Sequence, residues 1–239
     1  MPRPDRQERA ERILDAAARL FAHYGYDKTT VDEIAREAGV SKGAIYLHWP
    51  GKEALAEALL YREVRCVIED FLQRLETDPE GGTIGSIYRH GLQATFANPL
   101  VRAVLSSDNR VLGDYLHRLG PDFYRMRFEA ARALIERMQA AGLIRRDLSP
   151  EVVTYLLTML GLGLSTAGGL LPAEVRPPPG EVAEALADVV QRALAPEGGG
   201  DREAGKRLVR AYVAEVTQRY EELRGLRRDV DDGQPSDSG

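Results

Sequence analysis

The chain has 239 residues, of which 44% are hydrophobic and 29% are charged, and its formal net charge is -5 at pH 7. This length and apolar content allow a substantial core, in one large domain or in a small domain and a larger one. The negative total argues against a protein coated in nucleic acid, but it leaves room for a local basic face. Cys66 is the sole cysteine, which excludes an internal disulfide. The N-terminal residues are charged and amphipathic, unlike a signal peptide, so we expect a cytoplasmic protein.

Two short helices are predicted at the start of the chain. Residues 6–24 carry apolar side chains at the spacing of one helical face, and Gly25 is placed to end that helix. Thr29 or Thr30 caps the next helix, which Gly39 closes. The acidic residues in the first turn of this second helix suit the helix dipole.

A third short helix follows directly. Ser41 caps it, it runs through Leu47, and Pro50 stops it before a long helix from about Lys52 to Leu75. Three short helices with a tight glycine turn between the second and the third have the layout of a helix-turn-helix. The sequence therefore predicts a small DNA-binding unit at the N-terminus.

The third helix of such a motif lies in the DNA major groove, with its N-terminal residues nearest the base edges. Small side chains there permit a close approach, and polar ones reach bases or phosphate oxygens. Lys52 is expected to offer a charge and a backbone amide to a phosphate, and Ile45 to face the core. The residues that we expect to contact DNA are Thr30, Ser41, Lys42, Gly43, Ala44, Tyr46, His48 and Lys52.

Acidic and basic residues roughly balance over the first sixty positions, so this unit has no obvious basic face. Arg3, Arg6 and Arg9 lie where a flexible basic arm, residues 1–8, would reach a neighbouring groove or phosphates. A disordered tail explains the same residues.

The rest of the chain is also predicted to be helical. After a break at TDPEGGT, helical patterns cover residues 84–97, 100–119 with an interruption near Asn109, 122–141, 152–173, 181–194 and 202–226. Residues 227–239 have the composition of a disordered tail.

The segment 152–173 has no charged residue and is about as long as a membrane span. It contains several glycines, alanines, serines and threonines, and neither flank carries an aromatic or basic belt. We therefore expect a helix buried inside a helical domain or a dimer interface, and no membrane association.

A resemblance to a known family lies in the segment TTVDEIAREAGVSKGAIYLHWPGKEALAEALL. It resembles the DNA-binding domain of tetracycline-repressor-like (TetR) transcriptional regulators, over about Arg9 to Leu60. Two positions depart from the family pattern. Trp49 stands where phenylalanine is usual, and Gly51 where a capping serine, asparagine or aspartate is common. Both keep the role, since an indole fills the same pocket and glycine is an acceptable N-cap.

The resemblance implies an all-α fold, with an N-terminal three-helix helix-turn-helix domain followed by a larger helical domain for ligand binding and dimerisation. We expect the first domain over residues 1–55, the second over 56–226 and the tail over 227–239. By position, the helices at 152–173 and 181–194 form the dimer interface of the family. The small and branched residues that suit such an interface are Ala183, Ala187, Val189, Val190 and Ala193. The helix at 202–226 exceeds the usual complement, and either extends the dimer or covers one domain.

The resemblance also implies a small-molecule effector. The candidate residues for its pocket are Tyr88, Phe96, Asn98, Tyr124, Phe128, Tyr155 and Met159. His90 and His117 lack the close partners of a metal site, and no cofactor motif occurs, so we expect neither metal nor cofactor. A redox role for Cys66 has no resolving partner to support it.

No catalytic motif occurs, so we expect a protein that is not an enzyme. The main hypothesis is a homodimeric, ligand-responsive transcriptional regulator, a repressor that binds palindromic double-stranded DNA and is released by an effector. Two alternatives stay open at this point. One is a ligand-independent DNA-binding activator or architectural protein, and the other is a helix-turn-helix that docks on protein.

Overall fold

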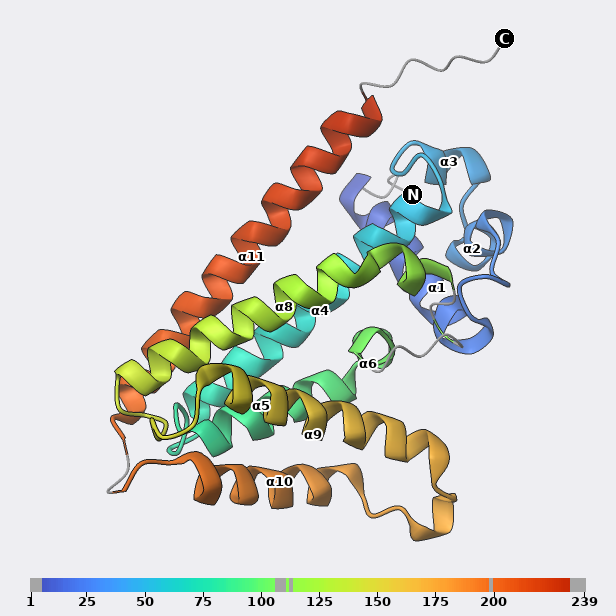
Figure 1. The fold of residues 1–239 in the computed structure, drawn as a ribbon. Coiled ribbons are helices and arrows are strands. Elements are labelled where there is room, and N and C mark those ends of the chain that lie inside the picture. The colour runs from blue at the N-terminus through green and yellow to red at the C-terminus, as the bar shows by residue number, and fades with distance from the viewer. Residues whose placement is uncertain (1–5, 106–110, 112–113, 198–199, 233–239) are drawn as a thin grey trace.

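The computed structural model describes residues 6–105, 111, 114–197 and 200–232, and these fold into α-helices and a short 3₁₀ helix, with no strand among them (Figure 1). The elements in chain order are α1 (Arg6–Tyr24), α2 (Val31–Ala38), α3 (Lys42–Tyr46), α4 (Lys52–Thr77), α5 (Ile84–Ala97), α6 (Pro99–Leu105), α8 (Asp114–Ala140), α9 (Pro150–Leu170), η1 (Ala173–Val175), α10 (Pro179–Leu194) and α11 (Arg202–Asp232). The all-α expectation is confirmed.

A first hydrophobic core holds the N-terminal helices together. It takes side chains from α1, α2, α3 and the start of α4, and its fully buried members include Phe21, Ile34, Ile45 and Leu55. Trp49 is also buried there, as expected for an indole in place of phenylalanine. Since each short helix is too short to be stable alone, this shared core determines the orientation of α3.

Helix α6 also belongs to the first core, which the sequence did not indicate. Leu100, Ala103 and Val104 are buried against the side chains of α1 and α4. The N-terminal helices are thus packed on a segment that comes later in the chain. Because α4 is continuous from this core to the far end of the molecule, the predicted boundary at residues 55 and 56 falls inside a helix.

A second core lies between α5, α8, α9 and α10. Its most deeply buried side chains include Met138, Ile144, Val153 and Val190. Helix α9 packs on α8, and α10 packs on α5. The two cores together account for the two-part organisation that the sequence predicted.

Helix α8 shows that the predicted break at Gly120 and Pro121 is wrong. The backbone is helical through both residues. A proline in a helix interior removes one hydrogen bond and costs about 3 kcal/mol. Helix α8 as a whole packs against α9 and α11. The other predicted interruption, near Asn109, lies outside the described residues.

Helix α11 covers the domain on the side away from α10 (Figure 1). Its first half packs on α8 and α4, where Val209 is fully buried and the Lys206 ammonium donates to the carbonyl oxygen of Glu76 at 3.1 Å. Gly82, at φ +90°, and Gly205 let the turn after α4 touch this helix backbone to backbone. The helix continues to Asp232, so the prediction of disorder from residue 227 is wrong for 227–232. Residues 233–239 lie outside the described residues.

Helix α9 corresponds to the uncharged segment. Within the described residues, no helix combines the length and the apolar character that crossing a bilayer requires.

Candidate DNA-binding surface

Helices α2 and α3 are fixed by local capping as well as by the core. Thr30 is the N-cap of α2, its side chain accepts from the Glu33 amide, and the Glu33 carboxylate accepts from the Thr30 amide at 2.8 Å. This capping box settles the choice between the two threonines, because Thr29 is buried and its hydroxyl donates to Gly25 at 2.8 Å. Gly39 ends α2 in the left-handed conformation, at φ +66°.

Helix α3 presents its polar and small residues to solvent. Ser41 caps it by accepting from the Ala44 amide, and Ile45 is fully buried in the first core. Lys42, Gly43 and Tyr46 are exposed. The outward face therefore carries a cation, two small residues and a phenol, which are groups that can approach a groove and contact bases or phosphates.

Gly43 has no structural reason to be glycine. A Cβ built on it would meet a single neighbour, the Ser41 hydroxyl oxygen at 3.9 Å, which is ordinary van der Waals contact. Glycine within a helix is less favourable than alanine by roughly 0.5–1 kcal/mol. The absent side chain leaves the backbone of α3 open to a partner that approaches it closely.

Lys42 forms an ion pair that the sequence did not predict, with one of the acidic residues of the first turn of α2. Its ammonium lies 2.8 Å from the carboxylate of Asp32, in the first turn of α2, and the hydrogen bond raises the pKa of the lysine. Both side chains are largely exposed. The two residues are ten positions apart and on different helices, so helical periodicity does not indicate the pair and only the tertiary arrangement reveals it.

The ammonium of Lys52 faces inward, contrary to the expected phosphate contact. It donates to the carbonyl oxygens of Tyr26 and Thr29, both at 3.0 Å, and lies 4.2 Å from the centre of the Tyr26 ring. The Tyr26 amide in turn donates to the carbonyl oxygen of Val111 at 2.8 Å. Lys52 therefore connects the loop before α2 to the start of α4, and this loop contacts Val111.

Replacing Lys52 by methionine should lower the free energy of unfolding by about 1–3 kcal/mol, because two charge-assisted hydrogen bonds are lost. The salt dependence of DNA binding should keep its slope. If Lys52 contacted a phosphate, its replacement would instead reduce this slope by about one. Urea unfolding, together with binding titrations at several salt concentrations, separates the two roles, and a reduced slope would restore the phosphate contact.

His48 follows α3 and is partly buried beside Trp49, with ring centres 5.2 Å apart. Burial lowers its pKa, and the nearby Arg6 and Arg9 lower it further. Arg6 is in the first turn of α1 and donates to the carbonyl oxygen of Leu47 at 3.4 Å. The part of the predicted arm from residue 6 onward is thus helical, and Arg3 lies outside the described residues.

The lowered pKa of His48 predicts a stability change with pH. The unfolded chain binds a proton near its ordinary value of about 6.5, whereas the folded chain binds it only at lower pH, so acidification through this window favours unfolding. We expect the stability lost between pH 7.5 and pH 5.5 to be smaller in His48→Gln than in the wild type. Urea midpoints at the two pH values measure this difference, and equal losses would contradict it.

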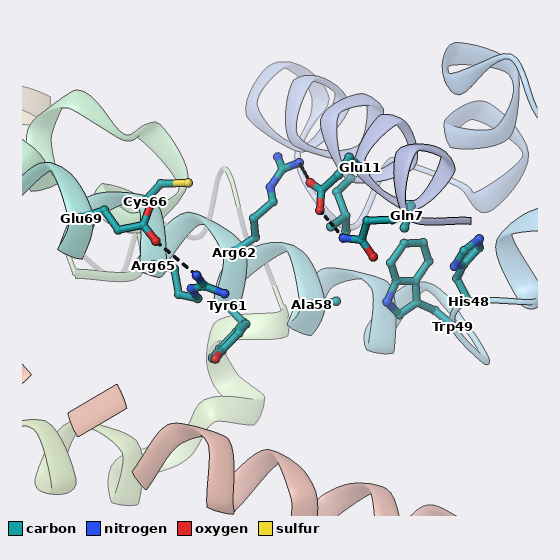
Figure 2. A pocket seen from close by; sticks show the side chains of 12 residues that line it. Gln7, Glu11, His48, Trp49, Ala58, Tyr61, Arg62, Arg65, Cys66 and Glu69 are labelled. Carbon is teal, nitrogen blue, oxygen red and sulfur yellow. Dashed lines mark hydrogen bonds and ion pairs between the residues drawn. The ribbon is translucent and has the colours of Figure 1, made fainter. Parts of the chain in front are cut away.

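A cleft of about 470 Å³ lies beside this unit, between α1 and α4 (Figure 2). Its charged side chains are paired with one another, since Arg62 contacts Glu11 at 3.2 Å and Arg65 contacts Glu69 at 3.2 Å. Cys66 lies at one end. Burial raises the pKa of its thiol, as do the neighbouring carboxylates, so this thiol is poorly suited to redox sensing.

Comparisons with known proteins identify the family. A family model described as bacterial regulatory proteins of the tetR family matches residues 13–59. The HTH-type transcriptional repressor Rv1474c of Mycobacterium tuberculosis is 31% identical over 163 residues, which are 65% of this chain and 80% of that repressor. The chain belongs to the tetR family.

Other relatives of this TetR-family chain differ in length. The A-factor receptor protein of Streptomyces griseus is 31% identical over 179 residues, 72% of this chain, and the chain spans 59% of that receptor. The crystal structure of NalD, a secondary repressor of a multidrug efflux pump in Pseudomonas aeruginosa, matches with a TM-score of 0.56 and 24% identity, over 82% of this chain and 100% of NalD. That likeness supports the fold.

Three of the expected pocket residues of this TetR-family chain lie on its surface or make contacts between helices. Tyr155 and Met159 are 61% and 51% exposed, on the outer face of α9. Asn98 accepts from the amides of Leu100 and Val101 and donates to Glu63 at 2.6 Å, so its amide caps α6 and links it to α4. The apolar pattern of α9 could not distinguish an inner from an outer face, because the whole segment is uncharged.

The other four, Tyr88, Phe96, Tyr124 and Phe128, are partly buried on α5 and α8. The Tyr88 hydroxyl donates to the carbonyl oxygen of Leu157 on α9 at 3.1 Å, and burial raises its pKa to about 12. His90 is buried, and its ring nitrogen lies 2.9 Å from the Asp78 carboxylate. The side chain of His117 lies outside the described residues. Among the described residues, no group of histidine, cysteine and acidic side chains could hold a metal.

The small residues of α10 face α5 of the same chain, which corrects their expected place at a partner. Ala183, Ala187 and Val190 are buried, and a Cβ on Gly85 of α5 would lie 2.8 Å from the carbonyl oxygen of Ala187. Of the five residues expected at the interface, Val189 and Ala193 are exposed. The larger apolar surface is on α9, whose exposed side chains are Val152, Tyr155, Leu156, Met159, Leu160, Leu162 and Leu170.

Proposed function

We propose that this TetR-family transcriptional regulator is a homodimeric repressor that binds a palindromic DNA operator and is released by a small-molecule effector. The observation that carries the proposal is the outer face of α3, where Gly43 lies between Lys42 and Tyr46 without steric need for glycine. The proposal also includes Thr30 at the N-cap of α2, Ser41 at the N-cap of α3, Ala44 within α3 and His48 just after it. In this proposal residues 1–55 form the DNA-reading unit, and residues 56–226 form the domain for effector binding and dimerisation.

The dimer is proposed through α9, with the exposed side chains of α10 at its edge. The exposed residues Val152, Tyr155, Leu156 and Met159 lie three or four positions apart and so form one apolar stripe along α9. A contiguous apolar stripe of this kind is typical of protein interfaces. A two-fold axis through it would place two α3 helices on one duplex, as a palindrome requires.

The effector is proposed to bind between α5, α8 and α9. Tyr88, Tyr124 and Phe128 are partly buried there, and such aromatic side chains suit a ligand that is mostly apolar with a polar end. The solved structures that resemble this chain in fold include one protein in complex with stearoyl-CoA and another in complex with choline. Those ligands are properties of those proteins, and they leave the chemical class open.

Selection of bound sequences from random duplex DNA tests the reading unit, with Tyr46→Ala and Lys42→Ala beside the wild type. We expect one palindromic site that both variants bind at least about tenfold more weakly. Without any preferred site, the helix-turn-helix would be a protein-docking module. With a site that no small molecule releases, the protein would be a ligand-independent activator or architectural protein.

A further inference from the structure

Asp32 is an acidic side chain on the proposed DNA-reading face, where a carboxylate repels phosphates. Asp32 does not cap α2, because Thr30 and Glu33 form the capping box of this helix. Its carboxylate instead reaches across to Lys42 at the start of α3. An exposed ion pair contributes little to folding stability, and although the first turn of α2 favours an acid through the helix dipole, neither effect requires the carboxylate to point toward Lys42.

The pair places a donor and an acceptor side by side. The Lys42 nitrogen and the Asp32 oxygen are 2.8 Å apart, and both side chains are exposed. The lysine has further N–H groups and the carboxylate has further lone pairs, so each can make another contact while the ion pair persists.

The major-groove edge of a G·C pair has the complementary arrangement. Guanine offers two acceptors, O6 and N7, and cytosine offers the N4 amino donor. O6 and N4 are themselves hydrogen-bonded to each other, so they lie about 2.9 Å apart. Lysine is a common partner of guanine, and aspartate is a partner of cytosine N4.

We propose that Asp32 and Lys42 act together as a base-reading pair that specifies one G·C pair in each half of the operator, Lys42 donating to guanine and Asp32 accepting from cytosine. This inference rests on the proposed function, since it requires α3 to enter the major groove. It makes Asp32 a specificity-determining residue that no helix-turn-helix pattern in the sequence would reveal. An A·T pair also places an acceptor, thymine O4, beside a donor, adenine N6, so the preference for G·C comes from guanine N7, which gives the lysine a second acceptor next to O6.

The test compares the sites selected by the wild type and by Asp32→Asn. Asparagine has the same shape without the charge, and it pairs with adenine. We expect the palindrome to be kept, the G·C preference at one symmetric position to fall at least about fivefold, and the preference there to move toward A·T. Asp147→Asn removes the same charge from an exposed ion pair with Arg145, far along the chain, and should leave the selected site unchanged.

Loss of the negative charge also strengthens binding to every sequence, so the ratio between G·C and A·T operators is the deciding quantity. Lys42→Ala should lose the same base preference as Asp32→Asn. An unchanged ratio in Asp32→Asn, with uniformly tighter binding, would overturn the inference and leave the proposed function standing. A wild type that selects no site would overturn both. Asp32→Ala removes the carboxylate without adding an amide. It therefore separates the loss of the carboxylate from any new base contact that the asparagine makes.

Discussion

Replacing Gly43 by leucine should weaken operator binding by roughly 10- to 100-fold, the range of one or two disrupted base-pair contacts. The fold should not suffer. The position is exposed, and a Cβ there meets only the Ser41 hydroxyl oxygen at 3.9 Å. Removing the glycine from helix α3 should stabilise the free protein by up to about 1 kcal/mol, which corresponds to a rise of about 2–4 °C in the unfolding midpoint. Affinity and stability therefore change in opposite directions, which a damaged fold would not produce.

A graded series makes this test sharper. Gly43→Ala should have a smaller effect on affinity than Gly43→Leu, because the added volume is smaller, whereas both should raise the unfolding midpoint. Gly91 of α5 is a matched control, since a Cβ there also meets nothing within 4 Å. Gly91→Ala should raise the midpoint and leave operator affinity unchanged. If Gly43→Leu bound the operator as well as the wild type, α3 would not approach DNA as proposed.

Helices and caps with local signals were predictable from the sequence. Gly39, Ser41 and Pro50 mark the ends of helices through their own local chemistry. The short helices α2 and α3 therefore lie where they were expected. The predicted helix break at Gly120 and Pro121 was also based on a local signal, and it was wrong. There the helix continues through a residue whose local preference is to end it, so the local signal alone was not sufficient.

The direction of a side chain was much harder to predict than its helix. Lys52 begins α4 as expected, yet its ammonium turns inward to Tyr26 and Thr29, because the fold brings two carbonyl oxygens within 3.0 Å of it. Tyr155 and Met159 are on the expected helix but on its outer face. Asp32 was expected only as an acid in the first turn of α2, and its pairing with Lys42 was not predicted because the two residues are close only in space. Sequence periodicity says which residues share a face, and only the tertiary structure says what that face meets.

Placing a charge on the outer stripe of α9 should convert the protein from dimer to monomer. Tyr155 and Met159 are four residues apart and mostly exposed in the single chain, so they point the same way from adjacent turns. In a two-fold interface each residue faces the same surface of its partner, and therefore each substitution introduces two charges. Burying an unpaired carboxylate costs several kcal/mol, which exceeds what the remaining contacts can offset.

The double variant Tyr155→Glu, Met159→Glu should sediment as a monomer at low micromolar concentration, with unchanged helical content by circular dichroism. It should lose tight binding to the palindrome, because one reading unit contacts only half of the site. Met159→Leu keeps the apolar surface and should remain dimeric. Ala211→Glu adds a charge to an exposed position of α11 and should also remain dimeric.

The two readouts of this experiment are the oligomeric state and the affinity for the palindrome. Together they test whether dimerisation through α9 is what allows two α3 helices to bind one operator. If α9 forms the dimer, the monomeric variant should still bind an isolated half-site weakly, since α3 and its core lie in other helices. A double variant that stays dimeric would move the interface away from α9. A monomeric variant that binds the palindrome as tightly as the wild type would show that one reading unit suffices, and the palindrome would then have no role in recognition.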